Sequence, residues 1–212
     1  MKARGASAFT LMELVAVMAI IAVIATLSLP AIMPMMRSSS LNTGAGMVVD
    51  ELNLARQTAL TENREVQVRL YKLPSSSDSS DVQFRAFRCF VKESEDPVQW
   101  KPLTKVRYLS DQVIFSADPK YSTLLDDGNA ARSGLSRSTE TFPGSSVPTT
   151  YVSFSFRPDG GTNLSPIDPP LGNWFLTLHL AKDPKNATTG LPNNYFTTQV
   201  EPVTGRVRTF RP

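Results

Sequence analysis

Residues 8–36 read AFTLMELVAVMAIIAVIATLSLPAIMPMM, and this stretch decides the fold. From Leu14 to Met36 it carries no charged side chain over 23 residues. As a helix rising about 1.5 Å per residue, that run would span about 34 Å, enough to cross a bilayer. Glu13 stands at its start, where a carboxylate is costly unless it has a partner. The stretch therefore predicts a long N-terminal helix whose one acid has a function.

Two simpler interpretations explain less of this stretch. A secretory signal peptide would account for Lys2 and Arg4 at the start, but its apolar core is usually about 7–15 residues long and no A-x-A cleavage site follows before Arg37. A plain membrane anchor has the right length and leaves Glu13 unexplained.

The seven residues AFTLMEL that open the stretch resemble the processing site of type IV prepilins. Members of that family have a short basic leader, a cut before an aromatic residue, a glutamate four residues further on, and then an apolar run. Phe9, Thr10, Leu11 and Glu13 match this pattern in identity and spacing. Ala8 departs from it, because the family usually has glycine immediately before the cut.

The resemblance implies a processing and assembly pathway. Prepilin peptidase would cut between Ala8 and Phe9 and methylate the new amine of Phe9. In a filament with other pilins or pseudopilins, the Glu13 carboxylate would lie beside the amine of a neighbouring subunit, and two buried charges that pair are tolerated where one alone is not. Pro30 stands where these proteins carry a helix-breaking proline.

Four segments follow from this interpretation: a leader at 1–8, a transmembrane and filament helix at 9–36, an amphipathic continuation at 37–63 and a β-rich domain at 64–212. The amphipathic stretch carries one apolar stripe at helical spacing, with Asn63 as its expected end; the stripe comprises Val48, Leu52, Ala55 and Ala59. The charged side chains Asp50, Glu51, Arg56 and Glu62 are expected mainly off this stripe.

From Arg64 the apolar period changes to two, which is typical of strands. The first expected strand begins at Val66. Six further strands are expected at Val82–Lys92, Gln112–Ala117, Tyr151–Arg157, Asn173–Lys182, Tyr195–Glu201 and Arg206–Phe210. Loops rich in Pro, Ser and Asp separate them, the longest at 126–150. A long helix followed by antiparallel strands predicts an α+β fold of pilin-like architecture.

Three short segments narrow the resemblance to the H-type minor pseudopilins of type II secretion and their minor-pilin relatives, the GspH/FimT group. These segments are LARQTA at 54–59, FRPDGG at 156–161 and GRVR at 205–208. The start sequence at 7–13 also resembles a second family of prepilin-like proteins, the Verru_Chthon cassette D proteins.

Charge and topology predict the compartment. The basic leader before the apolar run predicts a single-pass inner-membrane protein with a cytoplasmic N-terminus and a periplasmic domain. Removing residues 1–8 takes away Lys2 and Arg4, so 20 basic and 19 acidic side chains remain. This near balance argues against nucleic acid as the main partner. A contact with DNA is still an alternative, because Arg206, Arg208 and Arg211 form a local basic cluster in the sequence.

No pattern of catalytic residues is evident. The single histidine, His179, is expected to face solvent on its strand, and the single cysteine, Cys89, to fill a small core position. One of each cannot form a His/Cys zinc set, and no phosphate-binding loop or nucleophile elbow is present, so we expect no metal, no cofactor and no enzyme activity.

The sequence thus predicts a structural minor pilin or pseudopilin of a type II secretion system or a type IV pilus-like filament. One alternative is a DNA-binding minor pilin for DNA uptake. The other is a membrane-anchored enzyme or ligand-binding domain unrelated to pilins. Cleavage between Ala8 and Phe9 would distinguish the two pilin hypotheses from the membrane-anchored enzyme or ligand-binding domain.

Overall fold

The computed structural model describes residues 10–126, 134–142, 147–167 and 173–212, with the backbone alone for residues 27–34. It begins with helix α1, Leu11–Glu62, of 52 residues. Asn63 follows with φ of 52°, the left-handed conformation that commonly ends helices and that asparagine adopts more easily than most residues. The helix thus stops at the residue that the sequence indicated.

α1 runs without interruption through Pro30, so the helix break expected there is wrong. A proline removes one backbone hydrogen bond and crowds the preceding turn, and a long helix accommodates both while its other hydrogen bonds continue. Within the described part of the chain, no helix has a stretch that is both long and apolar enough to cross a membrane.

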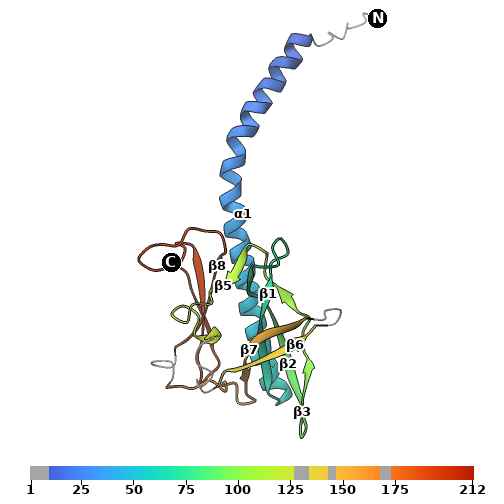
Figure 1. Ribbon diagram of the computed structural model, residues 1–212, viewed down its shortest axis with the longest axis vertical. Coiled ribbons are helices and arrows are strands. Elements are labelled where there is room, and N and C mark those ends of the chain that lie inside the picture. The colour runs from blue at the N-terminus through green and yellow to red at the C-terminus, as the bar shows by residue number, and fades with distance from the viewer. Residues whose placement is uncertain (1–9, 127–133, 143–146, 168–172) are drawn as a thin grey trace, which may run out of the picture. The chain divides into compact units, whose positions relative to one another are not determined.

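The chain divides into two compact units, Met1–Ser39 and Ser40–Pro212. The second contains two antiparallel sheets (Figure 1). The larger has the order β3-β2-β1-β7-β6, with β4 also paired to β2; its strands are β1 Val66–Pro74, β2 Val82–Glu95, β3 Val98–Pro102, β4 Arg107–Tyr108, β6 Ser136–Thr141 and β7 Pro148–Phe156. The smaller has the order β10-β9-β8-β5; its strands are β5 Val113–Phe115, β8 Trp174–Leu180, β9 Tyr195–Val200 and β10 Val207–Phe210. A short 3₁₀ helix, Thr123–Leu125, precedes β6.

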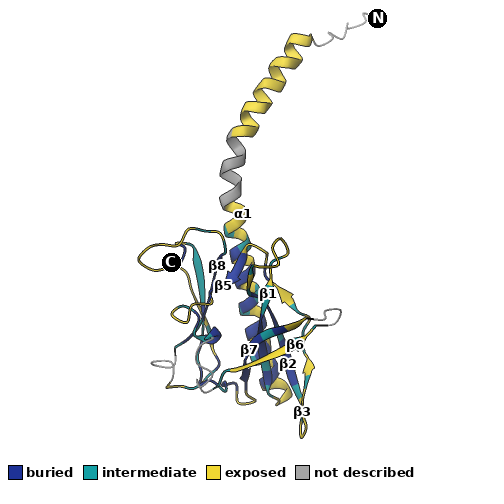
Figure 2. Cartoon of the chain, viewed as in Figure 1, coloured by how far each residue is buried: buried dark blue, intermediate teal, exposed yellow. Residues whose placement is uncertain are grey.

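One hydrophobic core joins the C-terminal part of α1 to both sheets (Figure 2). The helix contributes the predicted stripe, now extended toward its N-terminal side by Leu41 and Ala45, which are fully buried. The larger sheet contributes matched rows, for example Val68 opposite Cys89 and Phe154. The smaller sheet adds apolar side chains of β8 and β9, which are Trp174, Leu176, Leu178, Leu180 and Val200. The predicted α+β class, with a long N-terminal helix packed on antiparallel strands, is confirmed.

Candidate functional site

The start of α1 is closed by Thr10 and Glu13. The backbone N–H and the hydroxyl of Thr10 each donate to the Glu13 carboxylate at 3.3 Å, and the Glu13 N–H donates to the Thr10 hydroxyl at 3.2 Å. This is a capping box, in which two side chains satisfy backbone donors that the first turn of a helix leaves free. The carboxylate also lies at the positive end of the helix dipole, where an acidic side chain stabilises the helix. Glu13 therefore has a partner within its own chain.

The surface that follows this cap is apolar and exposed. Every residue from Leu11 to Thr26 is exposed, including Met12 at 81% and Ile20 at 59%. Ala8 and Phe9, the expected processing site, lie outside the described residues. A contiguous exposed apolar surface of this extent marks a site of interaction.

The three short segments singled out in the sequence meet at one place in the second unit. From the last turns of α1, Arg56 Nε donates to the carbonyl oxygen of Gly160 at 3.3 Å and to that of Thr204 at 3.0 Å. Gly160 belongs to the turn after β7, and Thr204 belongs to the turn between β9 and β10. Arg56 therefore lies off the apolar stripe, as expected, and ties the helix to two turns.

Glycine is required where these two turns touch. Gly205 has φ of 62°, and a Cβ atom there would lie 2.2 Å from the Gly160 carbonyl oxygen. A Cβ atom on Gly161 would lie 2.5 Å from the carbonyl oxygen of Val203. Backbone therefore packs directly on backbone, which positions the start of β10 against the rest of the domain.

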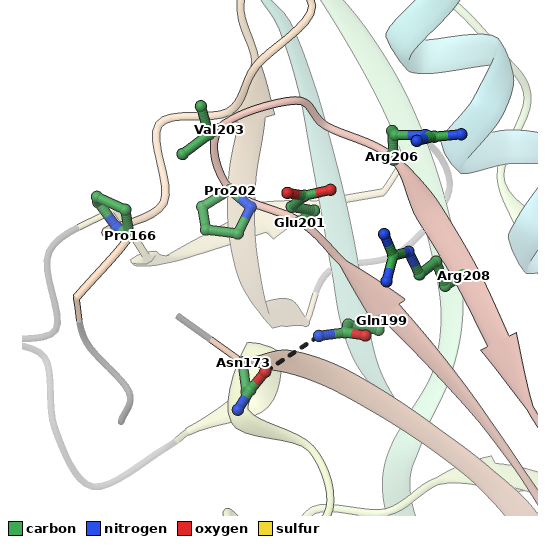
Figure 3. A pocket seen from close by; sticks show the side chains of 8 residues that line it. All are labelled: Pro166, Asn173, Gln199, Glu201, Pro202, Val203, Arg206 and Arg208. Carbon is green, nitrogen blue, oxygen red and sulfur yellow. Dashed lines mark hydrogen bonds between the residues drawn. The ribbon is translucent and has the colours of Figure 1, made fainter. Parts of the chain in front are cut away.

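The three C-terminal arginines do not form one cluster. Arg211 donates to Asn42 Oδ1 at 2.9 Å and to Asn194 Oδ1 at 3.3 Å, which ties the chain end to α1. Arg206 and Arg208 instead line a groove of about 240 Å³, together with Asn173, Gln199, Glu201 and three apolar residues (Figure 3). The expected grouping of three arginines is therefore reduced to two.

His179 is buried, so the expectation that it faces solvent is wrong. Only 4% of the residue is exposed, and its Nδ1 lies 3.0 Å from the Leu180 carbonyl oxygen. Burial lowers the pKa of His179 below its usual value because a charged imidazolium loses hydration there. Strand β8 is buried on both faces: the segment 118–125 lies along it, where the Thr177 N–H donates to the Ser122 hydroxyl and the Thr177 hydroxyl donates to the Tyr121 carbonyl oxygen.

Cys89 is a buried core residue, as predicted. Burial raises the pKa of its thiol, and the nearby Glu51 carboxylate adds to that effect. Glu51, expected off the buried stripe, is itself only 4% exposed; its carboxylate accepts from the Thr104 hydroxyl and lies 3.7 Å from Arg107 Nε. These contacts, from the loop after β3 and from Arg107 of β4, explain this exception to the stripe.

Within the part of the chain that the structure describes, no three His, Cys, Asp or Glu side chains come together as a metal site. The sequence interpretation missed the roles of three residues: Thr10 in the helix cap, Arg56 in the contact to the two turns, and Gln199 in the groove. The pattern Thr-x-x-Glu before an apolar run would have revealed the cap. No local pattern reveals the partners of Arg56 or Gln199.

Comparisons with known proteins find similarity only among solved structures. No family model matches the sequence, and no curated protein matches it. Two solved structures of the minor pseudopilin EpsH from the type 2 secretion system of Vibrio cholerae are similar to this chain, each at 8% sequence identity. One covers 82% of this chain and 98% of its own, with a TM-score of 0.43. The other covers 82% and 96%, with a TM-score of 0.42.

Proposed function

We propose that this protein is a structural minor pilin or pseudopilin, a subunit that joins a filament through the first half of α1. The observation that carries the proposal is the exposed apolar surface from Leu11 to Thr26, which begins at a capped glutamate. Burying one large aliphatic side chain is worth about 1.5–3 kcal/mol. A helix that is apolar all round therefore gains most when apolar neighbours cover every side.

The match to a prepilin start supports a finer account. Prepilin peptidase cuts between Ala8 and Phe9 and methylates the Phe9 amine. The uncharged run up to Met36 holds the subunit in the inner membrane, with its domain in the periplasm, until the helix enters the filament. There the Glu13 carboxylate exchanges its bonds to Thr10 for the amine of a neighbouring subunit. The pair of opposite charges sets the axial register.

Substitution of Glu13 tests the assembly step and separates it from capping. Glutamine at this position keeps an oxygen that can close the capping box but removes the charge. Alanine removes both. If Glu13 neutralises an amine, Glu13→Gln and Glu13→Ala should both be cleaved and both be missing from filament complexes, because either leaves an amine unpaired among apolar helices. Intact mass reports cleavage, and co-purification with other pilin subunits reports assembly.

The outcome that contradicts the assembly role is normal incorporation of Glu13→Gln. Glu13 would then serve only as a helix cap. Retention of residues 1–8 on the wild-type chain, in cells with an active prepilin peptidase, would contradict the processing step. Thr10→Ala is the matched control, since it weakens the cap while leaving the carboxylate in place.

DNA uptake is the second candidate, and the exposed guanidinium groups of Arg206 and Arg208 favour it. Two phosphate contacts would give a salt dependence of binding with a slope of only about −1.8 on logarithmic axes. We therefore expect weak binding at physiological salt. Tight binding of DNA, lost in the double variant Arg206→Ala and Arg208→Ala, would promote this function over a purely structural one.

A further inference from the structure

We infer that the groove at Arg208 is a docking site for an acidic segment of a neighbouring filament subunit, with a carboxylate held by Arg208 and Gln199. This inference rests on the proposed function, because it takes the partner to be another subunit of the filament. The groove belongs to the second unit, Ser40–Pro212, whereas the proposed function rests on the exposed apolar surface from Leu11 to Thr26.

The groove lies on the outer face of the smaller sheet, where strands β9 and β10 bring the polar side chains of Gln199 and Arg208 together. Arg208 pairs with Gln199 across β10 and β9, and Gln199 pairs with Phe175 on β8. Residues directly opposite each other in antiparallel strands project from the same face. Further along β8 the Thr177 hydroxyl donates to the Tyr121 carbonyl oxygen, so that part of the face is covered, whereas the groove is exposed at Arg208.

The groove carries two cationic side chains, Arg206 and Arg208. Among the described residues, neither Arg206 nor Arg208 has a side-chain hydrogen bond or ion pair, and both are exposed. In Figure 3 the Arg208 side chain extends toward Gln199 and Glu201, while that of Arg206 extends away from them. Arg208 is thus the residue aimed into the groove, and Arg206 adds positive charge at its rim.

The neighbouring amides are arranged to support an acceptor. Gln199 Nε2 donates to Asn173 Oδ1 at 3.1 Å, which fixes the orientation of the amide. That leaves a second N–H on Gln199, which stands directly opposite Arg208 in the sheet, for another acceptor. A guanidinium and an amide N–H together match the two oxygens of a carboxylate, and such charge-assisted bonds are stronger than neutral ones.

The size and charge of the groove favour an acidic peptide over other anions. Its volume of about 240 Å³ is below the roughly 300–1,000 Å³ of small-molecule pockets and suits one or two side chains. Glu201 shares the groove, oriented by the Thr204 hydroxyl at 2.8 Å. Its negative charge opposes a run of phosphates, whereas a single carboxylate can bind at Arg208 and leave Glu201 in solvent. The three apolar residues, Pro166, Pro202 and Val203, offer contacts to a peptide chain.

A zero-length cross-link tests this directly. In the full-length chain, Arg208→Lys places an amine near the position of the guanidinium. A water-soluble carbodiimide then joins that amine to carboxylates in contact with it, and a link to Glu201 of the same chain is distinguished by mass from a link to another subunit. The matched control is Arg157→Lys, since Arg157 is also exposed and has no side-chain partner among the described residues. Cross-linking is carried out on isolated filament complexes, and the joined peptides are identified by mass spectrometry.

We expect position 208 to link to an aspartate or glutamate of another pilin-like subunit, and position 157 to give no such link. We also expect Arg208→Glu to lower co-purification of that subunit at least tenfold, while Arg157→Glu leaves it unchanged. The inference is overturned if wild-type protein co-purifies with filament subunits but position 208 gives no link and Arg208→Glu has no effect. It is also overturned if nuclease treatment abolishes the partner contact, which would assign the groove to nucleic acid. If the wild-type chain joins no filament, the proposed function and this inference fail together.

Discussion

Two stretches of the same helix, 11–26 and 41–59, are both rich in apolar residues and behave in opposite ways. The first is exposed on every face. The second buries one stripe, at spacings of four and three residues, against the two sheets of its own unit. A helical period gives a helix an inside and an outside, so a single domain can cover it. An apolar run without that period has no polar side to leave in water, so its environment must come from other molecules.

The largest effect that separates the two stretches is the cost of truncating a side chain. Leu52→Ala should lower the free energy of unfolding by about 2–5 kcal/mol, because Leu52 is 2% exposed and its loss leaves a cavity. Ile20→Ala should leave it nearly unchanged, because Ile20 is 59% exposed. Denaturant unfolding of the detergent-solubilised chain measures both.

A fragment covering 37–212 extends this test. It should be soluble and unfold cooperatively, and Leu52→Ala should cost as much in the fragment as in the full chain. A fragment that aggregates, or a cost for Ile20→Ala that approaches that of Leu52→Ala, would break the distinction between the stretches.

The next effect concerns the hydrogen bonds that attach the second stretch of the helix to the turns at Gly160 and Thr204. Arg56→Ala should lower the free energy of unfolding by about 1–3 kcal/mol, because the carbonyl oxygens of Gly160 and Thr204 lose their shared donor. Arg64→Ala, at an exposed position just after the helix, is the control and should change little. Equal effects of the two substitutions would mean that the contact to the turns does not hold the helix in place.

The smallest effect is a pH dependence of the stability of the second unit, Ser40–Pro212, which contains His179. Burial lowers the pKa of His179 in the folded state, so below the usual pKa near 6.5 the unfolded chain binds the proton more readily. Stability should therefore fall as pH drops through that value, and His179→Gln should remove this contribution. Unfolding of the 37–212 fragment between pH 7 and pH 5 measures it. An unchanged slope in the variant would assign the acid sensitivity to other groups.

The strands that face the core could be predicted from the sequence, because alternation of apolar residues is the signal of a half-buried strand. β1, β2, β5, β7, β8, β9 and β10 all lie close to where that pattern placed them. β3, β4 and β6 were missed because almost all of their residues are exposed. β6 lies inside the expected loop at 126–150, since an exposed edge strand such as SRSTET has no apolar period to detect.

Burial on the outer faces could not be predicted, because it depends on which distant segment covers a strand. Arg69, on the polar side of β1, is 8% exposed: its guanidinium lies 3.8 Å from the centre of the Phe90 ring and donates to Glu140 at 2.8 Å. His179 is buried for a similar reason. The segments 54–59, 156–161 and 205–208 could each be recognised in the sequence. Their contact near Arg56 could not be predicted, because it depends on how the folded chain brings distant segments together.

Photo-cross-linking from within α1 tests the central claim most directly. A photoreactive side chain at Ile20 and, separately, at Leu52 reports what each stretch of the helix touches in cells that assemble the filament. We predict that position 20 gives adducts with the N-terminal helices of other pilin-like subunits, and that position 52 gives only links within its own chain. The absence of any subunit adduct at position 20, in protein that is otherwise folded, would contradict the account.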